Sequence, residues 1–308
     1  MSARSAFRRL VKPLSSIIVK VAGIDVVEVL RKLDDLQREL RLLTARLDLH
    51  ERYFDLQNNK QTKIHPLYET SPTPMLREWQ TLEKSLDSLR QLAPNAFQEW
   101  REAFDAGVQS YRDFPPDSCS VKGHFVSNLF RWFLRPLLHG RVLDIGCGPQ
   151  PVPWYLEGYP LQLLCGLDPI SFQEDHPFFF AQGVAEFLPW EDASFGTVIA
   201  ATSLDHVFLL DRVLSEVHRV LKKDGRFVVW VGFIKGARKY DPYGQDVRRV
   251  DRYHLFNFDR DWFEEIIQTL FDIEETYECP KPEVSVFYSL RPKQSEPRIL
   301  DTYANWRR

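Results

Sequence analysis

Two apolar stretches of the chain end in residues that could hold a nucleotide-like ligand. The stretch 141–145 runs into Gly146-Cys147-Gly148-Pro149, and the stretch 161–167 runs into Asp168-Pro169. Small residues let a ligand approach backbone N–H groups, and a carboxylate can accept hydrogen bonds from both hydroxyls of a ribose. The pair therefore predicts a site for a nucleoside-bearing cofactor.

Two histidines and an aspartate could act on a second substrate. Asp205 and His206 follow the apolar stretch 195–203, and His254 lies in an aromatic and Arg-rich segment after residue 244. An imidazole can take a proton near neutral pH, so these three residues are the candidate catalytic groups for a hydroxyl acceptor. Two alternatives stay open: His206 only packs, and the segment around His254 is a solvated loop.

The elements that must position these residues are strands alternating with helices. Five apolar stretches (141–148, 161–168, 178–185, 195–202 and 225–233) alternate with helical stretches such as 210–223, which indicates a parallel sheet covered on both faces. The last two candidate strands, 271–279 and 284–290, are separated only by "PKPE", and so short a connection forces an antiparallel pair. The sequence predicts a seven-stranded, mostly parallel α/β sheet with one antiparallel edge strand. Ligands of such sheets bind outside the carboxyl ends of the strands, where the candidate residues lie.

The region from about 135 to 291 resembles the class I S-adenosylmethionine-dependent methyltransferases, which have a Rossmann-like fold. Four stretches are similar to five motifs of that family in the same order, and the third stretch covers two of the motifs. The stretches are "VLDIGCGPQP", "GLDP", "GVAEFLPWEDASFGTVIAATSLDHV" and "LSEVHRVLKKDGRFVV". The stretch 146–151 lacks the GxGxxG pattern of dinucleotide-binding proteins, which argues against NAD.

The resemblance implies S-adenosyl-L-methionine as the cofactor and assigns its contacts. The turn after the first strand faces the aminoacid part, with an aspartate beneath it; the second strand ends at the ribose; the third ends near adenine; and the fourth ends near the methionine part. Where the family often has an aspartate for the adenine amino group, this chain has Val184. The implied cofactor-binding residues are Asp144, Gly146, Cys147, Gly148, Pro149, Asp168, Pro169, Ala185, Glu186, Ala200 and Ala201.

The acceptor is less defined by the sequence. The charged and aromatic segment around Arg248, Arg249 and Arg252 suits a polar acceptor, and "YHLFNF" is similar to methyltransferases of bacterial surface-polysaccharide assembly. We therefore expect O-methylation of a glycan or glycolipid. The alternatives are a quinone-type or small-metabolite methyltransferase, and a coiled-coil scaffold with a vestigial methyltransferase domain.

The N-terminal region has a different pattern. Residues 1–23 form a basic amphipathic stretch, which could lie on a membrane surface, pack on a partner subunit or act as a transit peptide. A heptad register then follows, and it predicts a coiled coil and a homo-oligomer, or else one helix folded back on its own domain. Its positions are Val26, Val29, Leu33, Leu36, Leu40, Leu43, Leu47, His50 and Phe54.

Composition limits the function classes. A net charge of −3 argues against a nucleic-acid-binding protein, and four cysteines without zinc or redox spacing predict neither a metal site nor a disulfide framework. No apolar stretch reaches the length of a membrane span and no secretory signal is recognisable, so a cytoplasmic location is expected, with a peripheral position at the inner membrane surface as the alternative. The predicted organisation is a basic segment and coiled coil over 1–60, a Pro-rich linker and helical cap over 61–134, the methyltransferase domain over 135–295 and a tail over 296–308.

Overall fold

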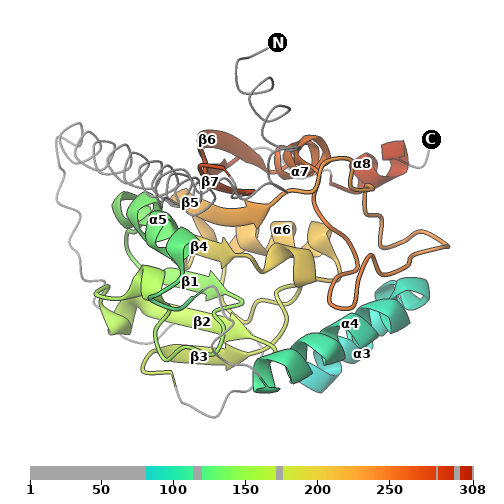
Figure 1. Ribbon diagram of the computed structural model, residues 1–308, viewed down its shortest axis with the longest axis horizontal. Coiled ribbons are helices and arrows are strands. Elements are labelled where there is room, and N and C mark those ends of the chain that lie inside the picture. The colour runs from blue at the N-terminus through green and yellow to red at the C-terminus, as the bar shows by residue number, and fades with distance from the viewer. Residues whose placement is uncertain (1–80, 114–119, 171–175, 282–283, 295–298, 307–308) are drawn as a thin grey trace, which may run out of the picture. The chain divides into compact units, whose positions relative to one another are not determined.

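The computed structural model describes residues 81–306 with gaps at 114–119, 171–175, 282–283 and 295–298 (Figure 1). The predicted basic segment and coiled coil lie outside the described residues. The helices are α3 (Leu82–Leu92), α4 (Pro94–Asp113), α5 (Phe125–Leu134), α6 (Leu210–Val220), α7 (Arg260–Ile267) and α8 (Ile299–Trp306). Short 3₁₀ helices are η3 (Arg135–Leu137), η4 (Trp154–Leu156), η5 (Leu161–Leu163) and η6 (Leu204–His206).

One seven-stranded sheet forms the centre of this region, as predicted. Its strands are β1 (Val142–Ile145), β2 (Leu164–Asp168), β3 (Phe179–Gln182), β4 (Phe195–Ala201), β5 (Leu221–Gly232), β6 (Phe271–Glu278) and β7 (Ser285–Pro292). They lie in the order β3-β2-β1-β4-β5-β7-β6. The first five pair in parallel, and every residue of β1, β2 and β4 is buried, as expected for strands covered on both faces.

The reversed strand is β7, which pairs antiparallel with β5 on one side and with the edge strand β6 on the other. The predicted antiparallel pairing at one edge is therefore confirmed, with the reversed strand one position in from that edge. Successive side chains of β7 point to opposite faces. Phe287 contacts Phe130 of α5 at a ring distance of 5.1 Å, and Tyr288 contacts Phe263 of α7 at 5.3 Å.

Helix α4 lies on the side of the sheet toward which the parallel strands point (Figure 1). Trp100 stacks on Phe208 with ring centroids 5.3 Å apart, and its indole N–H donates to the carbonyl oxygen of His206 at 3.1 Å. Phe97 meets the same Phe208 ring edge-on at 5.9 Å. The apolar face of α4 thus packs on the loop that follows β4, where the candidate site lies. Among the described residues, no helix has both the length and the hydrophobicity needed to cross a membrane.

Candidate active site

The turn after β1 depends on its glycines. Gly146 and Gly148 have φ values of 72° and 73°, a region that residues with a Cβ rarely adopt. A Cβ at position 146 would lie 2.5 Å from the Cβ of Ser203. The Ser203 hydroxyl donates to the carbonyl oxygen of Ile145 at 2.7 Å, so the loops after β1 and β4 are held against each other. Glycine is therefore required where the two loops meet.

Asp168 ends β2 and holds the same turn from the other side. Its Oδ2 accepts from the backbone N–H of Gly148 at 3.0 Å, and its Oδ1 accepts from that of Ile170 at 2.9 Å. Burial raises the pKa of Asp168 to about 6, against the lowering effect of these two hydrogen bonds. Each carboxylate oxygen has a further lone pair, so the side chain can still accept from a ribose.

Asp144 lies beneath the turn, as the resemblance implies, and outside the pocket lining. It is buried, and its Oδ2 accepts from the hydroxyl of Tyr155 at 2.9 Å. Burial is the main cause that raises its pKa to about 7, with a further contribution from the nearby Asp168. Asp144 therefore supports the turn and does not touch a ligand in the pocket.

Glu186 lines the pocket and also holds a neighbouring loop. Its Oε1 accepts from the backbone N–H groups of Phe208 and Leu209 at 2.8 and 2.9 Å, and burial raises its pKa. The carboxylate therefore anchors the loop after β4, although the residue also lines the pocket. This role could not be seen in the sequence, because the two N–H groups lie more than twenty positions further along the chain.

Some of the other predicted cofactor contacts line the pocket, and some do not. Ala200 is fully buried inside β4, and neither it nor Pro149 lines the pocket, so the structure does not support these two as contacts. Cys147 does line it, but burial raises the pKa of its thiol well above the usual value. A protonated thiol is a poor nucleophile, so Cys147 serves there as a small residue. The predicted contacts that line the pocket are Gly146, Cys147, Gly148, Asp168, Pro169, Ala185, Glu186 and Ala201.

These residues surround a pocket with an empty volume of about 1060 Å³, part of it open to solvent. One side is the cofactor end, with Gly146 and Asp168, and the lining continues to His206 and Val207 after β4. The cofactor residues and a candidate catalytic residue therefore share one cavity.

One wall of the pocket comes from α4, which lies in the region that the sequence predicts as a linker and helical cap. Its lining residues are spaced along one side of the helix and are mostly apolar or aromatic. The helical spacing in 94–113 was the available signal, but it does not say which surface the helix covers. These lining residues are Trp100, Ala103, Phe104, Gly107, Val108 and Tyr111.

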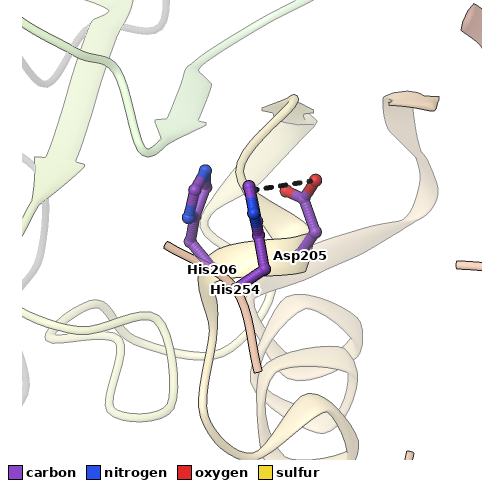
Figure 2. A group of neighbouring side chains, drawn as sticks. All are labelled: Asp205, His206 and His254. Carbon is purple, nitrogen blue, oxygen red and sulfur yellow. Dashed lines mark ion pairs between the residues drawn. The ribbon is translucent and has the colours of Figure 1, made fainter. Parts of the chain in front are cut away.

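The three candidate catalytic residues lie next to one another (Figure 2). The rings of His206 and His254 lie 4.4 Å apart, and His254 Nε2 is 3.9 Å from Asp205 Oδ2. Of the three, only His206 lines the pocket itself. The fold thus brings His254 close to a pair of residues that precedes it by almost fifty positions.

Asp251 is a fourth member of this cluster that the sequence interpretation missed. Both of its carboxylate oxygens lie 2.9 Å from Nδ1 of His254. It also accepts from the backbone N–H groups of Tyr253 and His254 at 2.7 and 2.9 Å. Partial desolvation raises the pKa of Asp251, but these hydrogen bonds lower it, and the pKa lies below its usual value. The carboxylate thus fixes the orientation of the His254 ring.

The segment between β5 and α7 is anchored to the rest of the domain. The rings of Tyr240 and Phe256 stack at 4.3 Å, and both residues are buried. Arg249 pairs with Glu99 and Glu102 of α4 at 3.1 and 2.6 Å. The segment therefore packs and forms ion pairs beside the pocket, whereas Asp246, Arg248 and Arg252 within it are exposed.

Comparison with known proteins supports the prediction that the sheet region holds a methyltransferase domain. A family model described as "Methyltransferase domain" matches residues 143–229. The chain is 34% identical over 92 residues to the mitochondrial arginine-hydroxylase NDUFAF5 of Mus musculus, which is 28% of this chain and 27% of that protein. It is 34% identical over 100 residues to the uncharacterized methyltransferase YcgJ of Bacillus subtilis, which is 29% of this chain and 39% of that protein.

The ubiquinone/menaquinone biosynthesis C-methyltransferase UbiE of Brucella anthropi is 45% identical over 49 residues, 16% of this chain and 19% of that protein. The chain thus spans well under half the length of each of these relatives. The 1,6-didemethyltoxoflavin-N1-methyltransferase structure from Burkholderia thailandensis aligns with a TM-score of 0.48 and 17% identity, covering 72% of this chain and 95% of that one. Together with the glycine turn, Asp168 and the sheet order, the family match identifies the region around residues 143–229 as a class I, S-adenosylmethionine-dependent methyltransferase domain.

Proposed function

We propose that this protein transfers a methyl group from S-adenosylmethionine to a hydroxyl group of a glycan or glycolipid. The observation that carries the proposal is the shared pocket, in which Asp168 and the Gly146 turn lie at one end and His206 lies further along. Methyl transfer is an in-line displacement, so the cofactor sulfonium and the acceptor oxygen must meet in one cavity.

In the proposed reaction, the acceptor oxygen attacks the methyl carbon as the bond from that carbon to sulfur breaks. S-Adenosylhomocysteine is released, and the hydroxyl proton leaves the acceptor. The cluster of Asp205, His206 and His254 is the group near the pocket that could assist removal of this proton. A positioned base of this kind contributes about 10²–10⁴-fold to a rate.

The pocket wall favours an acceptor that also has an apolar part. Helix α4 contributes Phe104, Val108 and Tyr111, which offer apolar surface beside the cofactor end. A lipid-linked sugar combines a hydroxyl group with such a part. The same wall supports a second candidate, a quinone-type aromatic acceptor, whose ring would lie against these side chains.

The proposal includes two features that rest on sequence pattern alone. The heptad register over 26–54 supports a homo-oligomer, and the basic stretch 1–23 supports peripheral contact with the inner membrane surface from the cytoplasmic side. Both suit an enzyme whose acceptor is lipid-linked.

The test has two stages. Calorimetry with S-adenosylhomocysteine should show binding to the full chain; its absence would favour the vestigial-domain scaffold over an enzyme. Labelled S-adenosylmethionine is then offered with lipid-linked sugars, water-soluble glycans and demethylated quinols in parallel. Transfer to a sugar hydroxyl supports the lead proposal, transfer to the quinol supports the second candidate, and binding without transfer to any sugar contradicts glycan methylation.

A further inference from the structure

Two separate segments bring three potential metal ligands together at the pocket rim. Asp205 and His206 belong to η6 after β4, and His254 belongs to the segment between β5 and α7. One nitrogen or oxygen from each lies within 4.8 Å of those of the other two (Figure 2). Imidazole nitrogens and carboxylate oxygens are the usual ligands of first-row divalent metals, and two histidines with one carboxylate leave coordination positions open.

The hydrogen bond of His254 prepares its other ring nitrogen for a metal. Since Asp251 can only accept, the two contacts of 2.9 Å require that Nδ1 of His254 carries the proton. In the neutral ring, Nε2 then has a free lone pair, and this atom faces Asp205 Oδ2 at 3.9 Å. Histidines that bind metals commonly donate their other N–H to a carboxylate in this way.

The second ligand group also lacks a partner. Asp205 Oδ1 is buried and has no hydrogen-bond partner among the described residues. The contact of Oδ2 with His254 Nε2 at 3.9 Å is too long for a hydrogen bond. A buried carboxylate oxygen without a partner is costly, and a cation bound by this carboxylate would offset part of that cost.

The distances suit one ion. Two ligand atoms that each lie about 2.0–2.2 Å from the same metal are at most about 4.4 Å apart. The Asp205–His254 separation of 3.9 Å falls within that limit. His206 is exposed, so its side chain is free to adjust by the small amount that the third ligand needs.

We propose that Asp205, His206 and His254 form a binding site for a first-row divalent metal such as Zn²⁺ or Mn²⁺. The sequence interpretation expected no metal, because it had only cysteine spacing and local motifs to judge from. His206 lines the pocket, so open coordination positions of the ion would face it. There the ion would bind the acceptor oxygen and favour loss of its proton to solvent, and the two imidazoles would then act as ligands in place of a base. This role rests on the proposed methyl transfer, whereas the site itself does not.

The site is tested on the full chain after dialysis against a chelator. Calorimetric titration with Zn²⁺ should show one tight site per chain. Titration with Co²⁺, monitored by the visible absorption of the bound ion, should show the same single site. His206→Ala and His254→Ala should each weaken binding by at least about 100-fold, and Asp251→Asn by about 10–100-fold. His218→Asn is the matched control, because it removes a histidine elsewhere but keeps a donor for the carbonyl oxygen of Lys293. That control should bind as the wild type does.

Binding of S-adenosylhomocysteine by each variant shows that its domain is folded. If a variant fails this check, X-ray absorption of the Co²⁺-loaded wild type replaces it, and two imidazole ligands are expected. The metal site would be overturned, even if methyl transfer were found, by the absence of a tight site in the wild type. Variants of His206 and His254 that bind the metal as tightly as the wild type would overturn it as well. Conversely, tight metal binding without cofactor binding would refute the proposed function and leave the metal site standing.

Discussion

At the scale of single residues, Asp168 links the cofactor turn to the end of β2 and should decide cofactor affinity. Asp168→Ala removes the acceptor of the Gly148 and Ile170 N–H groups as well as the expected ribose acceptor. We expect a loss of about 2–4 kcal/mol in the binding free energy of S-adenosylhomocysteine, measured by calorimetry. The exposed Asp246→Ala serves as the control. Unchanged affinity in Asp168→Ala would remove this residue from the site.

Asp144 makes a pH-dependent contribution to stability. Burial raises its pKa to about 7 in the folded protein from an ordinary value of 3.8. Because the folded pKa is the higher one, the contribution is fully present below about pH 4 and is lost as the pH rises through 7. Asp144→Asn, which can still accept from Tyr155, avoids the buried charge. We expect this variant to gain about 1–4 kcal/mol in unfolding free energy relative to the wild type at pH 8.

Denaturant unfolding at pH 4 and pH 8 measures this difference. The advantage of Asp144→Asn should shrink toward pH 4, where the wild-type carboxyl is largely protonated. An equal difference at both pH values would show that ionisation of Asp144 is not its cause.

At the scale of elements, ion pairs connect α4 to the segment that presents His254. Glu99 pairs with Arg248 and Arg249 at 3.2 and 3.1 Å. Burial raises the pKa of Glu99, but the hydrogen bonds from these arginines bring that pKa below the usual value. We expect Glu99→Gln to loosen the segment, raise KM for the acceptor several-fold and speed proteolysis near residues 244–252. Global stability should change by less than about 1 kcal/mol, because the pairs are partly exposed.

Arg226→Ala is the matched control for this prediction. It removes an ion pair of 3.1 Å with Glu274, which lies on β6 away from the pocket. Cofactor affinity should be unchanged in both variants. If Glu99→Gln and Arg226→Ala show the same proteolysis pattern and acceptor KM, the α4 ion pairs do not position the segment.

At the scale of the whole molecule, the heptad register predicts self-association. Residues 26–54 carry apolar residues, except for His50, at alternating steps of three and four over about four heptads. A chain that starts at Ser71 should therefore form a smaller assembly than the full chain, as measured by light scattering. Cofactor binding should persist, since the pocket residues lie after position 99. The same number of chains per particle in both would indicate a helix that folds back on its own domain.

The sequence by itself determined the sheet and the cofactor end of the site. Strands buried on both faces need continuous apolar residues, so the runs that became β1, β2 and β4 were visible without a fold. The four residues between the last two predicted strands allowed only an antiparallel pair, and β6 and β7 pair in this way. Gly146 and Asp168 follow strand ends directly, and parallel strands bring such ends to one edge of the sheet.

Only the tertiary structure decided what surrounds the cofactor end. The spacing in α4 showed an apolar side but not that this side would wall the pocket. Glu186 looked like a ligand contact, yet its carboxylate holds two backbone N–H groups of a later loop. His254 lies beside Asp205 and His206 because the segment after β5 folds back and pairs with α4. Local sequence patterns report which side of an element is buried, whereas contacts between elements far apart in the chain depend on how the whole domain packs.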